Sequence, residues 1–217
     1  MAIEDRFSRT RILMGDEGFL RLQKSSVLIL GVGGVGSFAL DCLYRSGIGR
    51  ITIVDCDYYD VTNQNRQIGS EAVGESKVEV LSHIYKGVIP IHQSVDKEFL
   101  GSLCLDDYSI ILDCIDDIDA KVEVANWGYR RLFSSMGSAK RLNPLAIRVD
   151  SVWKCYGDRF ARKFREKLKK TGFKGDFKVV FSSELPHCKN LGSFEGVTGS
   201  FGFQLASETI RRILKKP

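Results

Sequence analysis

Short apolar runs alternate with stretches of helical periodicity along the first 133 residues of the chain. The runs are brief and almost unbroken, which predicts strands buried on both faces of a sheet. They cover 27–30, 51–54, 88–91 and 109–113. The periodic stretches predict helices over 35–47, 75–86, 97–105 and 119–132. This alternation predicts an α/β fold: a Rossmann-like, doubly wound, mostly parallel sheet with right-handed crossovers.

The pattern differs on either side of this core. The N-terminal residues predict a polar arm followed by a helix over 16–24. After residue 134 we expect strands 146–150 and 178–182, helices 158–171 and 201–214, and irregular structure over 183–200. A hydrophobic content of 43% in 217 residues suits one sizeable core. We therefore expect a single domain, 1–217, with an arm and helix (1–26), a Rossmann-like core (27–133) and a C-terminal extension that carries a basic helix and binds substrate (134–217).

The first predicted strand runs into a glycine-rich turn. Glycine has no Cβ, so such a turn lets a phosphate approach backbone N–H groups at a helix N-terminus. The turn contains Gly31, Gly33, Gly34 and Gly36. Asp55 ends the next apolar run, where a dinucleotide fold places a carboxylate on the ribose. These features alone make NAD the default ligand.

A cationic, amide-rich segment after Asp55 favours a different nucleotide. The pentapeptide 63–67 reads NQNRQ and holds Asn65, Arg66 and Gln67. Lys77 opens the next predicted helix, where its charge opposes the helix dipole and calls for an anionic partner. A lysine and an arginine together suit a polyphosphate. The cluster therefore favours Mg-ATP, which would be consumed as a substrate, over NAD, which would be a reusable cofactor.

Asp116 is the predicted magnesium ligand. It lies just past a predicted strand, and ligands of doubly wound sheets bind at the carboxyl ends of the strands. Mg²⁺ is commonly held by one or two carboxylates plus phosphate oxygens. We prefer Asp116 to Asp113, which is closer to the buried strand. The alternative role of Asp116 is to cap the helix over 119–132, a role that Asp117 can also fill.

Composition and charge indicate which classes of protein and which kinds of partner are compatible with the chain. No apolar run approaches the length that spans a bilayer, and the N-terminus lacks the apolar core of a signal peptide. Six cysteines occur without a CxxC pair, so we expect a reduced, cytoplasmic protein without a paired-cysteine zinc site. The formal net charge is +5, but residues 154–178 alone hold ten Lys or Arg against three Asp or Glu. This basic segment predicts contacts with RNA phosphates through Arg162, Arg165 and Lys169.

Five motifs in order resemble one known superfamily. They are GVGGVGS, the Asp55 position, NQNRQ, the lysine of VGESK, and DCIDD. They are similar to the ubiquitin-activating-like adenylating enzymes with the ThiF/MoeB fold. The C-terminal half, with SSMGSAKRLNP and VVFSSELP, resembles the branch that dehydrates threonylcarbamoyladenosine in tRNA. The segment between VVFSSELP and the closing helix is shorter here than in that branch.

The resemblance implies a role for each site residue. The loop glycines and Gln67 would bind or support ATP, Asp55 would hold the ribose, and Asn65 would contact the phosphates. The catalytic set would be Arg9, Arg66, Lys77 and Asp116, with Arg9 reaching into the neighbouring subunit of a homodimer. The branch adenylates the threonyl carboxylate of the modified tRNA, then an internal attack closes a ring and releases AMP.

Other functions stay open from the sequence. The nearest alternative is activation of a ubiquitin-like sulfur-carrier protein, although the missing zinc cysteines argue against the MoeB and ThiF branches. A cysteine-desulfurase-type sulfur donor is then a further partner, with Cys188 as the thiol. A non-catalytic nucleotide- and RNA-binding protein and an NAD-dependent oxidoreductase are the remaining alternatives.

Overall fold

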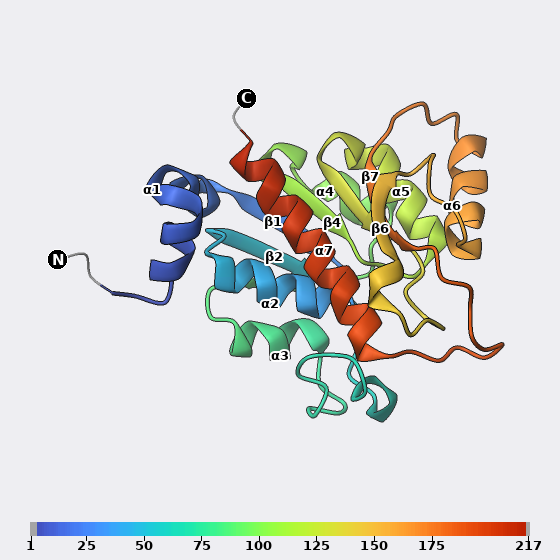
Figure 1. Ribbon diagram of the computed structural model, residues 1–217, viewed down its shortest axis with the longest axis horizontal. Coiled ribbons are helices and arrows are strands. Elements are labelled where there is room, and N and C mark those ends of the chain that lie inside the picture. The colour runs from blue at the N-terminus through green and yellow to red at the C-terminus, as the bar shows by residue number, and fades with distance from the viewer. Residues whose placement is uncertain (1–3, 216–217) are drawn as a thin grey trace.

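The computed structural model describes residues 4–215 and contains one seven-stranded sheet (Figure 1). The strand order is β3-β2-β1-β4-β5-β7-β6. All neighbouring strands pair in parallel except β6 and β7, which pair antiparallel. The strands are β1 (Ser26–Leu30), β2 (Arg50–Val54), β3 (Ile89–Ile91), β4 (Ile110–Asp113), β5 (Leu132–Ser135), β6 (Ile147–Ser151) and β7 (Lys178–Ser182). The predicted doubly wound, mostly parallel α/β fold is confirmed.

Helices cover both faces of the sheet (Figure 1). One face packs against α2 (Gly36–Ser46), α3 (Lys77–Ile84) and α7 (Glu195–Leu214). The other face packs against α4 (Lys97–Ser102), α5 (Ile118–Gly128) and α6 (Arg159–Lys170). The remaining helix, α1 (Ser8–Lys24), contacts the C-terminal end of α7 through Arg21, which donates to the Leu214 carbonyl at 3.2 Å. None of the helices within 4–215 has the length and apolarity needed to cross a membrane.

Strand β1 explains why the apolar runs in the sequence are continuous. Val27 and Ile29 enter the core on the α2 and α7 side, whereas Leu28 and Leu30 enter the core on the α5 and α6 side. All four side chains are fully buried. A strand covered on both faces needs apolar residues at every position, not at alternate positions.

The N-terminal helix begins earlier than the predicted 16–24. It starts at Ser8, and a kink at Gly15 (φ 73°, ψ 160°) divides it. Ile12 and Leu13, before the kink, are 84% and 81% exposed. The apolar positions of this segment therefore do not form one buried stripe, which is why periodicity detected only the second half.

Strand β5 was missed and the preceding helix was predicted too long. Helix α5 ends at Gly128, and β5 follows at Leu132–Ser135 as a central strand of the sheet. Two of its four residues are serines, so it lacks an apolar signature. Both serines are nevertheless buried, because hydrogen bonds replace those they would make to water.

Helix α7 begins at Glu195, inside the segment that was predicted to be irregular. Gly196, Gly199 and Gly202 lower the intrinsic helix propensity of its first turns. Packing accounts for two of them: a Cβ at Gly202 would lie 2.4 Å from the Val35 carbonyl oxygen, and one at Gly199 would meet the Phe38 ring. Glycine therefore lets α7 lie directly on α2, and this tertiary contact outweighs local propensity.

Candidate active site

The glycine turn between β1 and α2 is a tight crossing of backbone. Gly31 has φ +83°, and its N–H donates to the Val54 carbonyl at 2.8 Å. A Cβ at Gly36 would lie 1.9 Å from the Gly31 carbonyl oxygen. Helix α2 thus starts directly against the end of β1, with its first N–H groups at the carboxyl edge of the sheet.

Substitutions at two glycines are expected to separate packing from ligand access. Gly36→Ala should lower the free energy of unfolding by about 1–3 kcal/mol or more, because its Cβ overlaps backbone that cannot move away. Gly33→Ala should leave the free energy of unfolding nearly unchanged, since its nearest neighbour, the Gln67 amide nitrogen, is 3.6 Å away. Urea unfolding measures both. Equal stability of the two variants would contradict the crossing described here.

Asp55 accepts a hydrogen bond from the glycine turn. Its Oδ2 accepts a hydrogen bond from the Val32 N–H at 2.8 Å, and its Oδ1 accepts from the Asp57 N–H at 2.9 Å. The side chain is half-buried at the end of β2. The sequence therefore placed this carboxylate correctly beside the turn, and its role toward a ribose stays a prediction.

The NQNRQ segment folds back onto the glycine turn. A Cβ at Gly34 would lie 3.2 Å from Arg66 Cγ, and one at Gly33 would lie 3.6 Å from the Gln67 amide nitrogen. The Gln67 side-chain oxygen is buried without a hydrogen-bond partner. A buried polar atom of this kind costs free energy until a partner arrives, so it is a candidate ligand contact.

The Arg66 guanidinium is held in place by its own segment. Its Nη1 donates to the Thr62 carbonyl at 2.7 Å and to Asn65 Oδ1 at 2.8 Å. The Asn65 amide nitrogen donates to the Ser193 carbonyl at 3.0 Å. Asn65 therefore has protein partners on both polar atoms, and it ties Arg66 to the loop that precedes α7.

Lys77 has a protein partner for its charge. Its Nζ lies 2.8 Å from Asp57 Oδ2, and the Lys77 side chain is 7% exposed against 62% for Asp57. The anion that offsets this helix-start lysine is thus Asp57. A phosphate contact by Lys77 stays a prediction.

Three aspartates at the end of β4 have separate environments. Asp117 caps α5 by accepting from the Ala120 N–H at 2.8 Å. Asp113 is buried and paired within the core. Asp116 between them is exposed and, within 4–215, makes no side-chain hydrogen bond or ion pair. Of the three, only Asp116 therefore offers a free carboxylate.

Cys114 lies in the same loop. Burial raises the pKa of its thiol well above its usual range, so this cysteine is a packing residue.

A buried ion pair behind this loop was missed from the sequence. Lys121 Nζ lies 2.8 Å from Asp113 Oδ2, and both side chains are fully buried. Ser134 Oγ donates to the same Oδ2 at 2.6 Å, and Asp113 Oδ1 accepts from the Ile115 N–H at 3.1 Å. The network fixes the backbone that leads to Asp116. Nothing in a single lysine on a helix signals such a partner.

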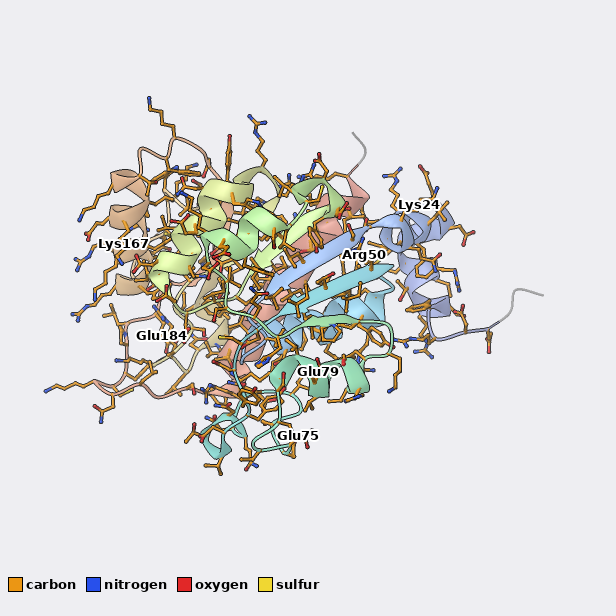
Figure 2. All side chains as sticks on the ribbon, turned by 180° about the vertical axis from the view of Figure 1, so that it is seen from behind. Lys24, Arg50, Glu75, Glu79, Lys167 and Glu184 are labelled. Carbon is orange, nitrogen blue, oxygen red and sulfur yellow. The ribbon has the colours of Figure 1, made fainter. Side chains whose placement is uncertain are left out.

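The residues predicted to contact RNA differ in their surroundings. Arg162 is exposed beside Glu166 at 3.8 Å, and Lys169 is exposed 5.8 Å from the Trp153 ring centroid. Arg165 is half-buried, and its guanidinium contacts the Cys155 sulfur. Figure 2 shows Lys167 of α6 and Glu184 at one end of the molecule, opposite Lys24 and Arg50.

Two other predicted residues lie away from the glycine turn in sequence and are surface groups. Arg9 is exposed on the first turn of α1. Cys188 is exposed in the loop after β7, where its thiol donates to the Asn190 carbonyl at 3.2 Å. A role of Arg9 in a neighbouring subunit and a sulfur chemistry at Cys188 stay predictions.

The geometry defines an α/β nucleotide-binding protein with a cationic, amide-rich wall at the glycine turn. A family model described as the ThiF family matches residues 7–217, so the chain belongs to the ThiF family. A tRNA threonylcarbamoyladenosine dehydratase of Bacillus subtilis (strain 168) is 36% identical over 192 residues, covering 83% of this chain and 76% of that protein.

Solved structures agree over almost the whole chain. The E. coli tRNA N6-threonylcarbamoyladenosine dehydratase, TcdA, in complex with AMP is 29% identical, with a TM-score of 0.92 and coverage of 99% of this chain and 98% of that chain. Its complex with ATP is 30% identical, with a TM-score of 0.91 and coverage of 99% and 97%. The family resemblance drawn from the five motifs is confirmed.

Proposed function

We propose that the protein is an ATP-dependent dehydratase that adenylates the threonyl carboxylate of tRNA threonylcarbamoyladenosine and cyclises it. The observation that carries this function is the near-complete match to dehydratases of that name, which include complexes with ATP and AMP. The glycine turn with Arg66 packed against it supplies the matching local chemistry.

The first step forms an acyl-adenylate. A threonyl carboxylate oxygen attacks the α-phosphorus of ATP, the bond between the α- and β-phosphates breaks, and pyrophosphate leaves. Donors that are fixed in advance where this negative charge grows lower the barrier. Arg66, held by Thr62 and Asn65, and Lys77, held by Asp57, are such fixed cations. The glycine turn and Gln67 would hold the nucleotide, with Asp55 on the ribose.

The second step closes a ring within the modification. An internal nucleophile attacks the activated carbonyl carbon, the bond to the AMP oxygen breaks, and one proton is released. The lost carboxylate oxygen leaves on AMP, so the substrate is dehydrated without any enzyme nucleophile. This chemistry gives Cys188 no required part.

The donors at the end of β4 fit a magnesium ion. Asp116 offers an exposed carboxylate that has no partner among residues 4–215, a hard oxygen ligand of the type Mg²⁺ prefers. When bound there with phosphate oxygens, the ion would neutralise charge on the leaving pyrophosphate. The chain's own contribution is to hold Asp116 at this edge through the Asp113 network.

A homodimer is part of the proposal. Arg9 is exposed on α1 and, among the residues that the structure describes, its side chain forms no hydrogen bond or ion pair, which suits a residue that acts in a partner's site. A cytoplasmic location and a sulfur donor for Cys188 stay predictions.

One reaction tests the proposed function. Purified protein, ATP, magnesium and tRNA that carries threonylcarbamoyladenosine should yield pyrophosphate, AMP and a tRNA nucleoside lighter by one water, as measured by mass spectrometry. Unmodified tRNA is the control and should give no AMP. AMP formed with a carrier protein but not with the modified tRNA would instead establish the sulfur-carrier alternative.

Charge reversal on α6 is expected to weaken tRNA binding without changing ATP binding. Arg162→Glu with Lys169→Glu should lower tRNA affinity about tenfold or more and flatten its salt dependence, because phosphate contacts release counterions. ATP binding should stay intact. Arg165 is left unchanged because its contact with Cys155 would confuse the result with misfolding. Unchanged tRNA affinity would remove α6 from the RNA-binding surface.

A further inference from the structure

A hollow lies at the amino ends of the strands, whereas the glycine turn lies at their carboxyl ends. Its volume is about 390 Å³, and it is lined by the amino ends of β5 and β7 and the last turns of α7. Helix α7 touches the glycine turn at Gly202, where a Cβ would lie 2.4 Å from the Val35 carbonyl oxygen. Its pocket-lining residues, Glu208 to Arg212, follow six to ten positions later, which places the hollow roughly 10–15 Å further along the helix at ~1.5 Å per residue. None of the proposed catalytic residues lines it.

Aromatic side chains line one part of this amino-edge pocket. Phe133 and Phe177 are buried beneath it, and Tyr129 is half-buried at its side. Phe173, from the loop after α6, packs edge-on against Tyr129 with ring centroids 5.3 Å apart. Phe133 and Phe177 are only 3% and 6% exposed, so among the three lining rings Tyr129 is the one that offers surface to solvent. An exposed aromatic ring can stack with a base of any sequence.

The rest of the pocket is strongly cationic. Five basic side chains line it against two carboxylates. One of these, Glu208, is shared by Lys178 at 2.6 Å and Arg211 at 2.8 Å. Within 4–215, Arg130, Arg212 and Lys215 form no ion pair. Arg212 donates instead to the Arg130 carbonyl, and its guanidinium lies 5.7 Å from the Phe133 ring centroid. The pocket therefore has unneutralised positive charge, with Arg212 near the Phe133 ring and Arg130 5.7 Å from the Tyr129 ring centroid.

We propose that the amino-edge pocket is a second RNA contact, in which Arg130, Arg212 and Lys215 bind phosphates and a base lies against the half-buried Tyr129 ring. This inference rests on the proposed function, in which RNA is the substrate. Basic residues continue from α6 through Lys174 in the following loop to the pocket, and that loop and the C-terminal end of α7 lie at the same edge in Figure 1. The basic surface thus extends from α6 to the amino ends of β5 and β7.

The combination of cations and an accessible tyrosine ring favours RNA over a free anion. Phosphate alone would need only the positive charges, and salt screens exposed charges so that they attract it weakly. The Tyr129 ring adds affinity for a base, roughly 1–3 kcal/mol per stacked base in single-strand binders.

The test compares two double variants with the wild-type protein. Arg130→Ala with Lys215→Ala removes two pocket cations and keeps the Arg130 carbonyl that accepts from Arg212. Lys86→Ala with Lys97→Ala removes two exposed charges that do not line the pocket and is the matched control. Binding of an unmodified tRNA transcript is measured against salt concentration, together with ATP binding and thermal unfolding.

The pocket variant should bind the transcript roughly tenfold more weakly and reduce the slope of log affinity against log salt by about 2. The control should change neither value, and both variants should bind ATP normally. Photocrosslinking of 4-thiouridine-substituted tRNA to wild-type protein should label peptides within 129–133 or 173–178. Excess inorganic phosphate should not abolish this labelling.

Wild-type affinity and salt slope in the pocket variant would overturn the inference, as would crosslinks confined to α6 or labelling abolished by phosphate. These results do not depend on turnover. A wild-type protein that fails to dehydrate modified tRNA but loses transcript binding in the pocket variant would reject the proposed function and keep the pocket. Normal dehydration with unchanged binding in the variant would do the reverse.

Discussion

Replacing Arg66 with alanine should lower kcat/KM for pyrophosphate release about 100- to 1,000-fold, the usual loss when one fixed transition-state donor is removed. The guanidinium is positioned by Thr62 and Asn65, and its Cγ packs against the glycine turn. Removing it leaves a gap where charge develops on the phosphates. Arg66→Lys should recover little activity, because a flexible ammonium cannot reproduce a planar fork at that place. Steady-state kinetics with modified tRNA measures the effect.

The matched control for Arg66 is Arg45→Ala. Arg45 is 71% exposed on α2 and pairs with Asp41 one turn earlier at 2.6 Å. Its loss should leave kcat/KM within about twofold, since exposed pairs contribute about 0–1 kcal/mol. Thermal unfolding of both variants should match the wild type. A fully active Arg66→Ala protein would contradict the role proposed for Arg66 at the phosphates.

Replacing Lys121 with alanine should lower the free energy of unfolding by about 3–5 kcal/mol, because it leaves the fully buried Asp113 carboxylate without its cation. Such a loss is a large part of the ~5–15 kcal/mol that stabilises a typical domain. Urea unfolding at neutral pH gives the value. Activity should fall as well, since Asp113 also holds the backbone before Asp116.

Two further variants separate charge burial from packing. Lys121→Met with Asp113→Asn removes both charges and should regain much of the lost stability, because no unpaired ion remains in the core. Lys167→Ala breaks an exposed pair with Asp119, whose side chains are 46% and 76% exposed, and should cost less than about 1 kcal/mol. A loss below 1 kcal/mol for Lys121→Ala would show that Asp113 does not depend on this lysine.

Most strands of the sheet could be predicted from the sequence, because a strand that is buried on both faces has apolar residues at nearly every position. β5 is the exception, since its buried Ser134 is satisfied by Asp113, 21 residues earlier in the chain. The start of α7 was missed for the opposite reason: glycines that weaken a helix locally are required by its packing on α2. Both errors come from tertiary contacts that local patterns do not contain.

The candidate site could be predicted only in part from the sequence. Gly31, Asp55 and Asp116 follow strand ends, and parallel topology brings strand ends to one edge. The partners of the charged groups could not be predicted. Asp57 for Lys77, and Ser193 for Asn65, are 20 and 128 residues apart from the groups they bind. Only the folded chain brings these pairs together.

The loop between β7 and α7 has both of its ends fixed by the scaffold, and this makes it a natural place for length to vary. Ser182 lies in the sheet and Glu195 starts a helix packed on α2, while 183–194 between them runs past the nucleotide site. Doubling the length of a flexible loop costs only about 0.6 kcal/mol of closure entropy. Relatives can therefore reshape the entrance to this site by insertion, and a longer loop grafted here should alter substrate choice while the sheet beneath it stays unchanged.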